Sequence, residues 1–192
     1  CCVRLVKCQR RIFKEANREL TKEEYIRLLN AAQKDHDDRL YLLIKTICAT
    51  GIRISELPYI TLEAAKRGHA MIYCKNKQRC ILLPQKICRE LTDYAKAHDI
   101  TAGYIFRTKS GRPVDRSNAW HAMKRLGREA GVPEDKIFPH NLRHLFARTF
   151  YDTEKDIVRL ADILGHSSID TTRIYTAASG AECMRQIDEL GL

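Results

Sequence analysis

Apolar residues recur three and four positions apart through most of this chain, the spacing that places them on one face of an α-helix. Thr21, followed three residues later by Glu24, forms a capping-box pattern that predicts a helix start. A second helix is predicted from about Asp38 to Gly51, because glycine suits the left-handed conformation that follows a helix. Further helices are predicted at about 86–98, at 116–130, from Pro139 to about Tyr151, and at 157–164 before Gly165.

One short stretch departs from this pattern. Residues 69–74 and 79–83 have the composition of antiparallel strands, joined by a polar turn at 75–78. The expected fold class is therefore α+β, mainly helical, with a small antiparallel sheet. The 192 residues suffice for one domain with its own core. We assign residues 21–192 to it. The chain begins with Cys, and residues 1–20 carry six Lys or Arg against two Glu, so we expect a basic linker from a missing N-terminal DNA-binding domain.

Positive charge is concentrated in blocks. The formal net charge is +10; residues 75–89 hold five basic residues and no acidic one, and residues 107–116 hold four against Asp115. Such blocks are typical of proteins that bind a polyanion, because each neutralised phosphate releases condensed counterions. We therefore expect a nucleic-acid partner, with a solvated basic surface as the alternative. No apolar run approaches the ~20 residues of a membrane span, so no membrane partner is expected.

The eight cysteines form no Cys-x-x-Cys pair and no zinc-finger spacing. Cys48 and Cys88 lie among apolar residues and are expected to pack as small hydrophobic side chains, in a reducing cytoplasm. A metal site formed by His69, Cys74 and Cys80 is a weak alternative. The acidic group at 35–38 fits a loop and helix N-cap better than the carboxylate cluster of a metal-dependent nuclease. We predict neither a metal nor a cofactor.

Five polar segments carry the residues that phosphoryl transfer without a metal requires. In chain order they are Thr-Gly-Ile-Arg-Ile-Ser-Glu-Leu at 50–57, Lys-Asn-Lys-Gln-Arg at 75–79, Phe-Pro-His-Asn-Leu-Arg-His at 138–144, Leu-Gly-His-Ser-Ser at 164–168, and a tyrosine at 175. Cleaving a phosphodiester requires a nucleophile, positive groups that stabilise the phosphorane, and a proton for the departing oxygen. Together the segments offer all three.

Two of the segments place cationic side chains in defined local positions. Arg53 follows the expected helix stop, and Glu56, three residues later, is placed to orient its guanidinium. His140 and Arg143 are three apart, so a helix that begins one residue before His140 presents both on one face. Backbone N–H groups at that helix start favour phosphate. Taken alone, Arg53 is also consistent with a surface arginine, and His140 with a helix cap.

The order and spacing of the five segments resemble the tyrosine site-specific recombinases, also called the phage integrase family, over roughly residues 21–192. Residues 50–57 match the family pattern T-G-x-R-x-S-E-L, residues 164–168 match L-G-H-x-S, and Tyr175 follows nine residues after His166. The resemblance implies the catalytic fold of that family. It also implies site roles: Arg53 and Arg143 bind the phosphate, Glu56 supports Arg53, His140 assists proton transfer at the tyrosine, His166 donates to a nonbridging oxygen, and Tyr175 is the nucleophile.

The general acid is expected in the hairpin. The family pattern is roughly G-K-G-x-K-x-R, and this chain is one residue shorter there, which favours Lys75 over Lys77 as the proton donor to the 5′-oxygen. We assign DNA contact to Lys77, Arg79 and Arg173.

The resemblance implies a function as well. Tyr175 cuts each strand to leave a 3′-phosphotyrosine, and exchange passes through a Holliday junction within a homo-tetramer on double-stranded DNA at specific recombination sites. The pattern suggests integration or excision of a mobile element, as by integrases of bacterial conjugative transposons or phages, with Xer-like resolution as a possibility. Such a protein acts in the bacterial cytoplasm at the nucleoid.

Two alternatives share part of this pattern. A type IB topoisomerase has the same chemistry, but in that family a lysine opens the segment that His140 opens here. A noncatalytic DNA-binding module explains the charge without the site residues. Beyond the tyrosine, residues 179–190 form an amphipathic segment that packs either within its own chain or on a neighbouring subunit.

Overall fold

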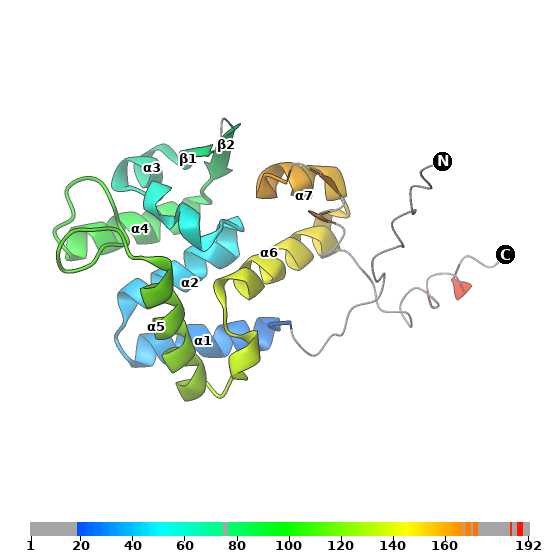
Figure 1. The fold of residues 1–192 in the computed structure, drawn as a ribbon, viewed down its shortest axis with the longest axis horizontal. Coiled ribbons are helices and arrows are strands. Elements are labelled where there is room, and N and C mark those ends of the chain that lie inside the picture. The colour runs from blue at the N-terminus through cyan, green and yellow to red at the C-terminus, as the bar shows by residue number, and fades with distance from the viewer. Residues whose placement is uncertain are drawn as a thin grey trace, which may run out of the picture.

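The computed structural model describes residues 19–74, 77–166, 168–169, 171–172, 185 and 188–189. Its elements, in chain order, are α1 (Lys22–Lys34), α2 (Asp38–Thr50), the 3-10 helix η2 (Ile54–Tyr59), α3 (Leu62–Arg67), β1 (His69–Cys74), β2 (Lys77–Leu82), α4 (Gln85–Ala97), α5 (Arg116–Glu129), the 3-10 helix η3 (Glu134–Lys136), α6 (Pro139–Glu154) and α7 (Ile157–Leu164). The predicted class, mainly helical with a small antiparallel sheet, is confirmed (Figure 1).

Helix ends lie where local capping chemistry sets them. The predicted capping box is present at the start of α1: the Thr21 amide donates to Glu24 Oε2 at 2.8 Å, and the Glu24 amide donates to Thr21 Oγ1 at 3.2 Å. Asp37, in the acidic group that we assigned to a loop and N-cap, accepts from the Leu40 amide at 3.0 Å and caps α2. Each contact satisfies an amide that the helix itself leaves without a partner.

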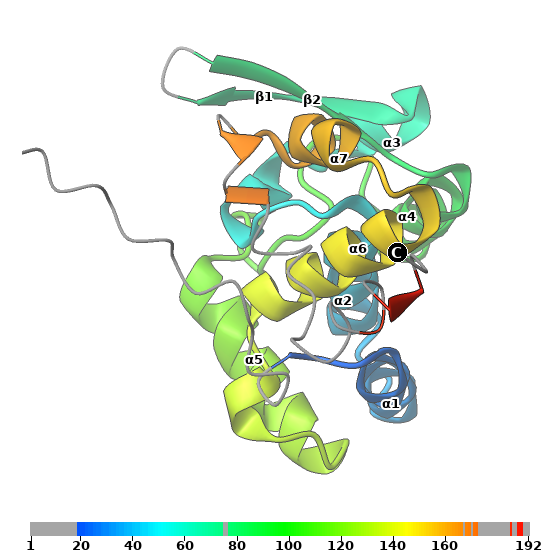
Figure 2. The ribbon, with the colours of Figure 1, turned by 90° about the vertical axis from the view of Figure 1, so that its right-hand side faces the viewer.

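Helix α2 is the centre of the domain. It packs against α1, α4, α5 and α6, which surround it in Figures 1 and 2. Leu43, Ile44 and Ile47 of α2 are buried in the main apolar core, and Cys48 packs at the edge of that core, as Cys88 of α4 does. Because α2 is covered on most sides, its C-terminal end is held rigidly, and the segment that carries Arg53 begins there.

A second, smaller core joins α6 to α7. Ala147, Leu160 and Leu164 are buried in it, with Phe146 and Phe150 packed against them. This cluster fixes the end of α7 beside the end of α2. In Figure 2, α7 lies beside the β1–β2 hairpin, so the hairpin, α2 and α7 meet in one region.

The hairpin differs from the prediction at its second strand. β1 and β2 pair antiparallel from His69 opposite Leu82 to Cys74 opposite Lys77, so β2 begins two residues earlier than the expected 79–83 and ends one residue earlier. The prediction followed the apolar residues, but backbone pairing continues into the polar segment because an exposed ladder does not require apolar side chains. The connection is therefore residues 75–76, the short length common in hairpins.

Other differences are small. The sequence pattern did not indicate η2 or α3, which are short elements of six residues each. Helix α6 runs three residues beyond the expected end at Tyr151, to Glu154, and stops where Lys155 takes a left-handed conformation at φ 55°. Among the described residues, no helix is long and apolar enough to cross a membrane.

Candidate active site

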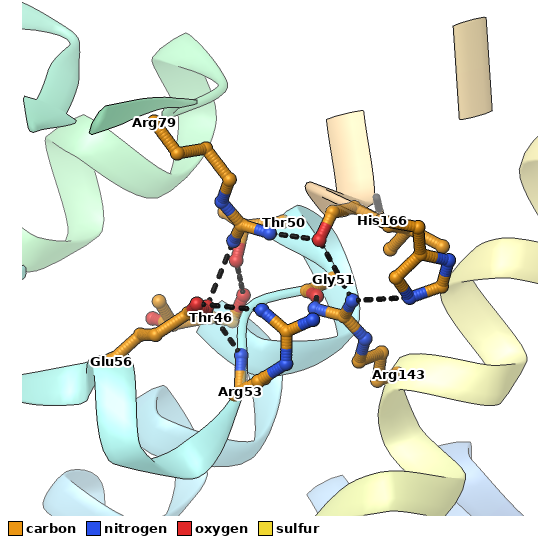
Figure 3. A network of polar contacts seen from close by, with 9 residues as sticks. Thr46, Thr50, Gly51, Arg53, Glu56, Arg79, Arg143 and His166 are labelled. Atoms are coloured by element: carbon orange, nitrogen blue, oxygen red, sulfur yellow. Dashed lines mark hydrogen bonds and ion pairs between the residues drawn. The ribbon is translucent and has the colours of Figure 1, made fainter. Parts of the chain in front are cut away.

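A network of polar contacts joins four segments that are distant in sequence. Its side chains come from the start of η2, strand β2, helix α6 and the turn after α7 (Figure 3). Within it, three guanidinium groups and one carboxylate leave two net positive charges, which is the electrostatic setting that an anionic phosphate requires.

Arg143 is a buried member of this network. Its side chain projects from α6, and the residue is only 2% exposed. Nη1 donates to the Gly51 carbonyl at 2.5 Å, and Nη2 donates to the Leu164 carbonyl at 2.8 Å. Burying a guanidinium is costly unless acceptors surround it. These two carbonyls supply that compensation, and they bind α6 to the ends of α2 and α7.

Gly51 makes the approach of these elements possible. It ends α2 at φ 64°, and a Cβ built there would lie 2.4 Å from Phe146 Cδ1 and 2.9 Å from Leu164 Cδ2. A larger residue would therefore push α6 and α7 away from α2. The glycine was predicted as a helix stop; its second role, close packing at the site, depends on contacts with residues about a hundred positions away.

Arg53 is held by Glu56, as the sequence suggested. Arg53 precedes η2, and its Nη1 donates to Glu56 Oε1 at 3.0 Å while its backbone amide donates to Glu56 Oε2 at 2.8 Å. The Arg53 side chain remains 45% exposed, whereas the Glu56 side chain is 10% exposed. A covered carboxylate thus orients a guanidinium whose outer edge is open to a ligand.

His166 follows the glycine that ends α7. Its Nε2 lies 2.9 Å from Arg143 Nη2, and its Nδ1 lies 2.8 Å from Thr172 Oγ1. Burial, together with the positive charges of Arg143, Arg53 and Arg79 and with His140, lowers the pKa of His166 to about 4. The imidazole is therefore neutral at pH 7 in the DNA-free chain.

A cleft of about 510 Å³ opens beside these groups. Arg53, His140 and Arg143 all line it, so the two residues of α6 that we expected on one face do share this cleft. His140 is exposed, and its ring meets that of His144 edge-on at a centroid distance of 4.5 Å. Phe138 occupies the N-cap of α6, so His140 is not the cap of this helix.

The other wall of the cleft was not predicted. Arg116, Ser117 and Trp120 of α5 line it, and Trp120 is 39% exposed. The available signal was the single tryptophan of the chain on a predicted helix with basic neighbours. An indole next to arginines suits a nucleotide, because the base or sugar packs on the ring while the phosphate meets the cations.

Arg79, expected at the DNA, lies inside the network. Its Nη2 donates to Glu56 Oε2 at 2.8 Å, its Nη1 donates to the Leu164 carbonyl, and its side chain is 13% exposed. Burial lowers the pKa of Arg79, and Glu56 opposes that shift.

Several predicted site residues lie outside the described residues, namely Lys75, Arg173 and Tyr175; for Lys77 the structure describes the backbone in β2 but not the side chain. The segment 179–190 is described only at 185, 188 and 189. Among the described residues, no group of three or more His, Cys, Asp or Glu is arranged to hold a metal ion.

The family follows from comparison with known proteins. The model of the phage integrase family matches residues 18–182, and the chain belongs to that family. Tyrosine recombinase XerA of Pyrococcus furiosus is 30% identical over 190 residues, which is 95% of this chain and 65% of that protein. Tyrosine recombinase XerH of Campylobacter jejuni is 30% identical over 82% of this chain and 47% of that protein. The chain thus spans about half to two thirds of the length of these curated relatives.

Solved structures of recombinases and integrases have the same fold as this chain. The crystal structure of XerA recombinase superposes with a TM-score of 0.74 at 26% identity, covering 89% of this chain and 62% of that one. XerH site-specific recombinase bound to its difH substrate, a pre-cleavage complex, gives 0.69 at 26% identity over 83% of this chain and 50% of that one. The Tn1549 transposon integrase in complex with transposon right end DNA shares the fold, with a TM-score of 0.70 at 20% identity over 93% of this chain and 68% of that one.

Proposed function

We propose that this chain is the catalytic domain of a site-specific DNA recombinase that cuts and rejoins strands through a 3′-phosphotyrosine at Tyr175. The observation that carries the proposal is the convergence of Arg53, Arg143 and His140 on one cleft, with His166 hydrogen-bonded to Arg143. Membership of the phage integrase family and the relatives named tyrosine recombinases support it. Residues 21–192 form this domain in the proposal, and residues 1–20 form the basic linker that leads into it.

The positions of the side chains in the site suggest a chemical role for each of them. Arg53 and Arg143 hold the nonbridging oxygens, because a guanidinium fork matches them and stays charged. His140, exposed at the cleft, takes the proton from Tyr175, and the hairpin lysine protonates the 5′-oxygen as it leaves. The covalent phosphotyrosine retains the energy of the broken bond, so rejoining requires no ATP. The neutral imidazole of His166 donates to a nonbridging oxygen once DNA displaces its present contacts.

The substrate of the proposed reaction is double-stranded DNA at a specific recombination site, and the working assembly is a homo-tetramer at the nucleoid. Two structures of XerH with difH DNA support the choice of duplex DNA. Integration or excision of a mobile element is the first candidate role. Resolution of the Xer type is the second, because the relatives at 30% identity carry that name.

A suicide substrate tests the chemistry. The DNA site is first selected from random-sequence duplexes. A nick is then placed beside the cleavage position, so that the short fragment with the free 5′-hydroxyl diffuses away after cleavage and the covalent adduct is trapped. The native chain should give a covalent complex that survives SDS and forms equally well in EDTA. Tyr175→Phe, which deletes only the phenolic oxygen, should bind the DNA and form none. Tyr104→Phe, at an exposed tyrosine outside the cleft, is the matched control and should react normally.

Three outcomes would contradict the proposal. An undiminished adduct from Tyr175→Phe would move the nucleophile elsewhere. Loss of cleavage in EDTA would favour a metal-dependent nuclease. Binding without any adduct from the native chain would favour a noncatalytic DNA-binding module. Locating the selected site in the genome of the source organism then separates the two roles, since a position at element ends marks integration and a single chromosomal position marks resolution.

A further inference from the structure

We infer that Arg79 is a positioning residue, which locks strand β2 onto the supports of both candidate catalytic arginines, rather than a ligand of DNA phosphate. The inference rests on the proposed cleavage activity. It concerns a residue that the sequence pattern had assigned to the DNA surface. Figure 3 shows the Arg79 guanidinium reaching from β2 between Glu56 and the chain before His166.

The first support is that both terminal nitrogens of Arg79 already donate to protein acceptors, while its buried Nε has no hydrogen-bond partner among the described residues. One terminal nitrogen donates to Glu56 Oε2 at 2.8 Å and the other donates to the Leu164 carbonyl. The side chain is 13% exposed, compared with 45% for Arg53. Arg53 and Arg143 both line the cleft, whereas Arg79 is not among the residues that line it. For Arg79, phosphate contact would require breaking a covered ion pair, which is costly.

The second support is what Arg79 shares with the other arginines. Glu56 accepts from Arg53 as well as from Arg79, and the Leu164 carbonyl accepts from Arg143 as well as from Arg79. Each acceptor therefore serves one cleft-lining arginine and Arg79 together. Removing Arg79 leaves Glu56 held by Arg53 and leaves the Leu164 carbonyl with Arg143 as its donor, so the support of each cleft arginine loses one of its contacts.

The third support is steric and independent of these hydrogen bonds. Gly165 lies directly against Arg79: a Cβ built on Gly165 would be 2.3 Å from Arg79 Cδ and 2.7 Å from Arg79 Nη1. Gly165 also has a φ of 65°, which favours glycine on its own. The glycine before His166 thus leaves room for the Arg79 side chain, and the hairpin and the His166 turn fit each other in this one arrangement.

The chemical consequence concerns geometry rather than affinity. Lys75, the expected general acid, precedes Arg79 by four residues on the same hairpin, so the anchor of β2 also limits where that hairpin attaches to the domain. Displacing a catalytic group by about 1 Å can cost 10²-fold in rate. A phosphate contact, in contrast, contributes about 0.9 to the slope of log affinity against log salt.

The test separates rate from affinity. Arg79→Met and Arg79→Lys are compared with the native chain for DNA affinity at several salt concentrations, and for single-turnover cleavage of the suicide substrate at saturating DNA. Positioning predicts a Kd and salt slope close to native, with the saturated cleavage rate about 10²-fold lower for Arg79→Met. Arg79→Lys should be nearly as slow, because one ammonium cannot span both acceptors. Arg128→Met, which removes one exposed charge on α5 outside the cleft, is the control and should cleave normally.

Each result that contradicts the inference points to a different explanation. A weaker Kd with a salt slope smaller by about 1 and a native saturated rate would make Arg79 a phosphate ligand. Full cleavage activity of Arg79→Lys would contradict the inference, because it would show that a positive charge at this position is enough and that bridging of the two acceptors is not needed. If Arg79→Met does not fold, Arg79→Lys, which keeps the charge, carries the same comparison. A native chain that forms no adduct would overturn the proposed function instead, whereas a cleaving native chain and an equally fast Arg79→Met would overturn only this inference.

Discussion

The guanidinium of Arg143 donates from Nη2 to Nε2 of His166 across 2.9 Å. A guanidinium can only donate, so Nε2 is the acceptor, and the ring proton is on Nδ1, which faces Thr172 Oγ1 at 2.8 Å. This fixes the neutral Nδ1–H tautomer in the DNA-free chain. The imidazole can donate from Nε2 to a phosphate only after the contact with Arg143 is broken and Nε2 gains a proton, either by a change of tautomer or by protonation of the ring.

Titration of His166 should follow from this arrangement. Its pKa lies at about 4 in the free chain, because burial and the neighbouring arginines disfavour the charged ring. A bound phosphate reverses the local charge, so the pKa should rise when the non-cleaving Tyr175→Phe chain binds its DNA site. Histidine NMR signals measured from pH 3 to 8, assigned with His166→Gln, check both values. A free-chain pKa near the ordinary value of about 6.5, unchanged by DNA, would contradict the geometry.

The same shift predicts how stability depends on pH. The folded pKa lies below the unfolded one, so between about pH 4 and 6.5 the unfolded chain binds the extra proton. The free energy of unfolding should therefore rise with pH across this window through His166 and become independent of it above. Urea unfolding of the native chain and His166→Gln at several pH values measures the difference. A slope as steep in His166→Gln as in the native chain would show that other groups cause it.

Gly51→Ala should destabilise the domain more than Gly68→Ala. Both glycines end a helix in the left-handed conformation, at φ 64° and 80°. An added Cβ meets Phe146 and Leu164 at Gly51, but nothing within 4 Å at Gly68. Gly68→Ala should cost about 1–2 kcal/mol for the backbone alone, and Gly51→Ala about 1–3 kcal/mol more for overpacking. Urea unfolding measures both, and equal costs would mean that the site relaxes freely around Gly51.

DNA binding should change the fluorescence of the single tryptophan. Trp120 lines the cleft with Arg53 and Arg143, so a nucleotide in the cleft covers the indole. Titration with duplex DNA should shift or quench the emission, and the fitted affinity should fall steeply between 50 and 200 mM salt because phosphate contacts dominate. Trp120→Phe should remove the signal and serves as the blank. Tight binding that leaves the emission unchanged would place the DNA elsewhere.

The choice between Lys75 and Lys77 can be decided by substrate chemistry. If Lys75 is the general acid, Lys75→Ala should slow cleavage by about 10²–10⁴-fold. DNA with sulfur at the 5′-bridging position should restore the rate, because a thiolate leaves without a proton. Arg53→Ala, which loses nonbridging stabilisation, should gain nothing from the sulfur. Rescue of Lys77→Ala, with Lys75→Ala near native on ordinary DNA, would exchange the two assignments.

Local chemistry made much of the fold predictable. The capping box at Thr21, the stop at Gly51 and the start of α6 at Pro139 were all evident, because a helix end is decided by residues within about four positions of it. The pairing of Arg53 with Glu56 was foreseen for the same reason, since the two are three residues apart. The short elements η2 and α3 were missed, as was the full length of β2, where tertiary contacts rather than apolar spacing set the limits.

The sequence by itself determined the longer helices, most of their ends, the family and the order of the candidate site residues, because each depends on spacing along the chain. Only the tertiary structure decided which polar groups from distant segments meet. Arg143 reaches the Gly51 carbonyl across 92 residues, and Arg79 reaches the Leu164 carbonyl across 85. A basic residue in a polar segment has the same local pattern whether it faces DNA or is buried. The packing of α2, α7 and the hairpin leaves the Arg53 side chain 45% exposed and places Arg79, 13% exposed, between Glu56 and the turn at Gly165.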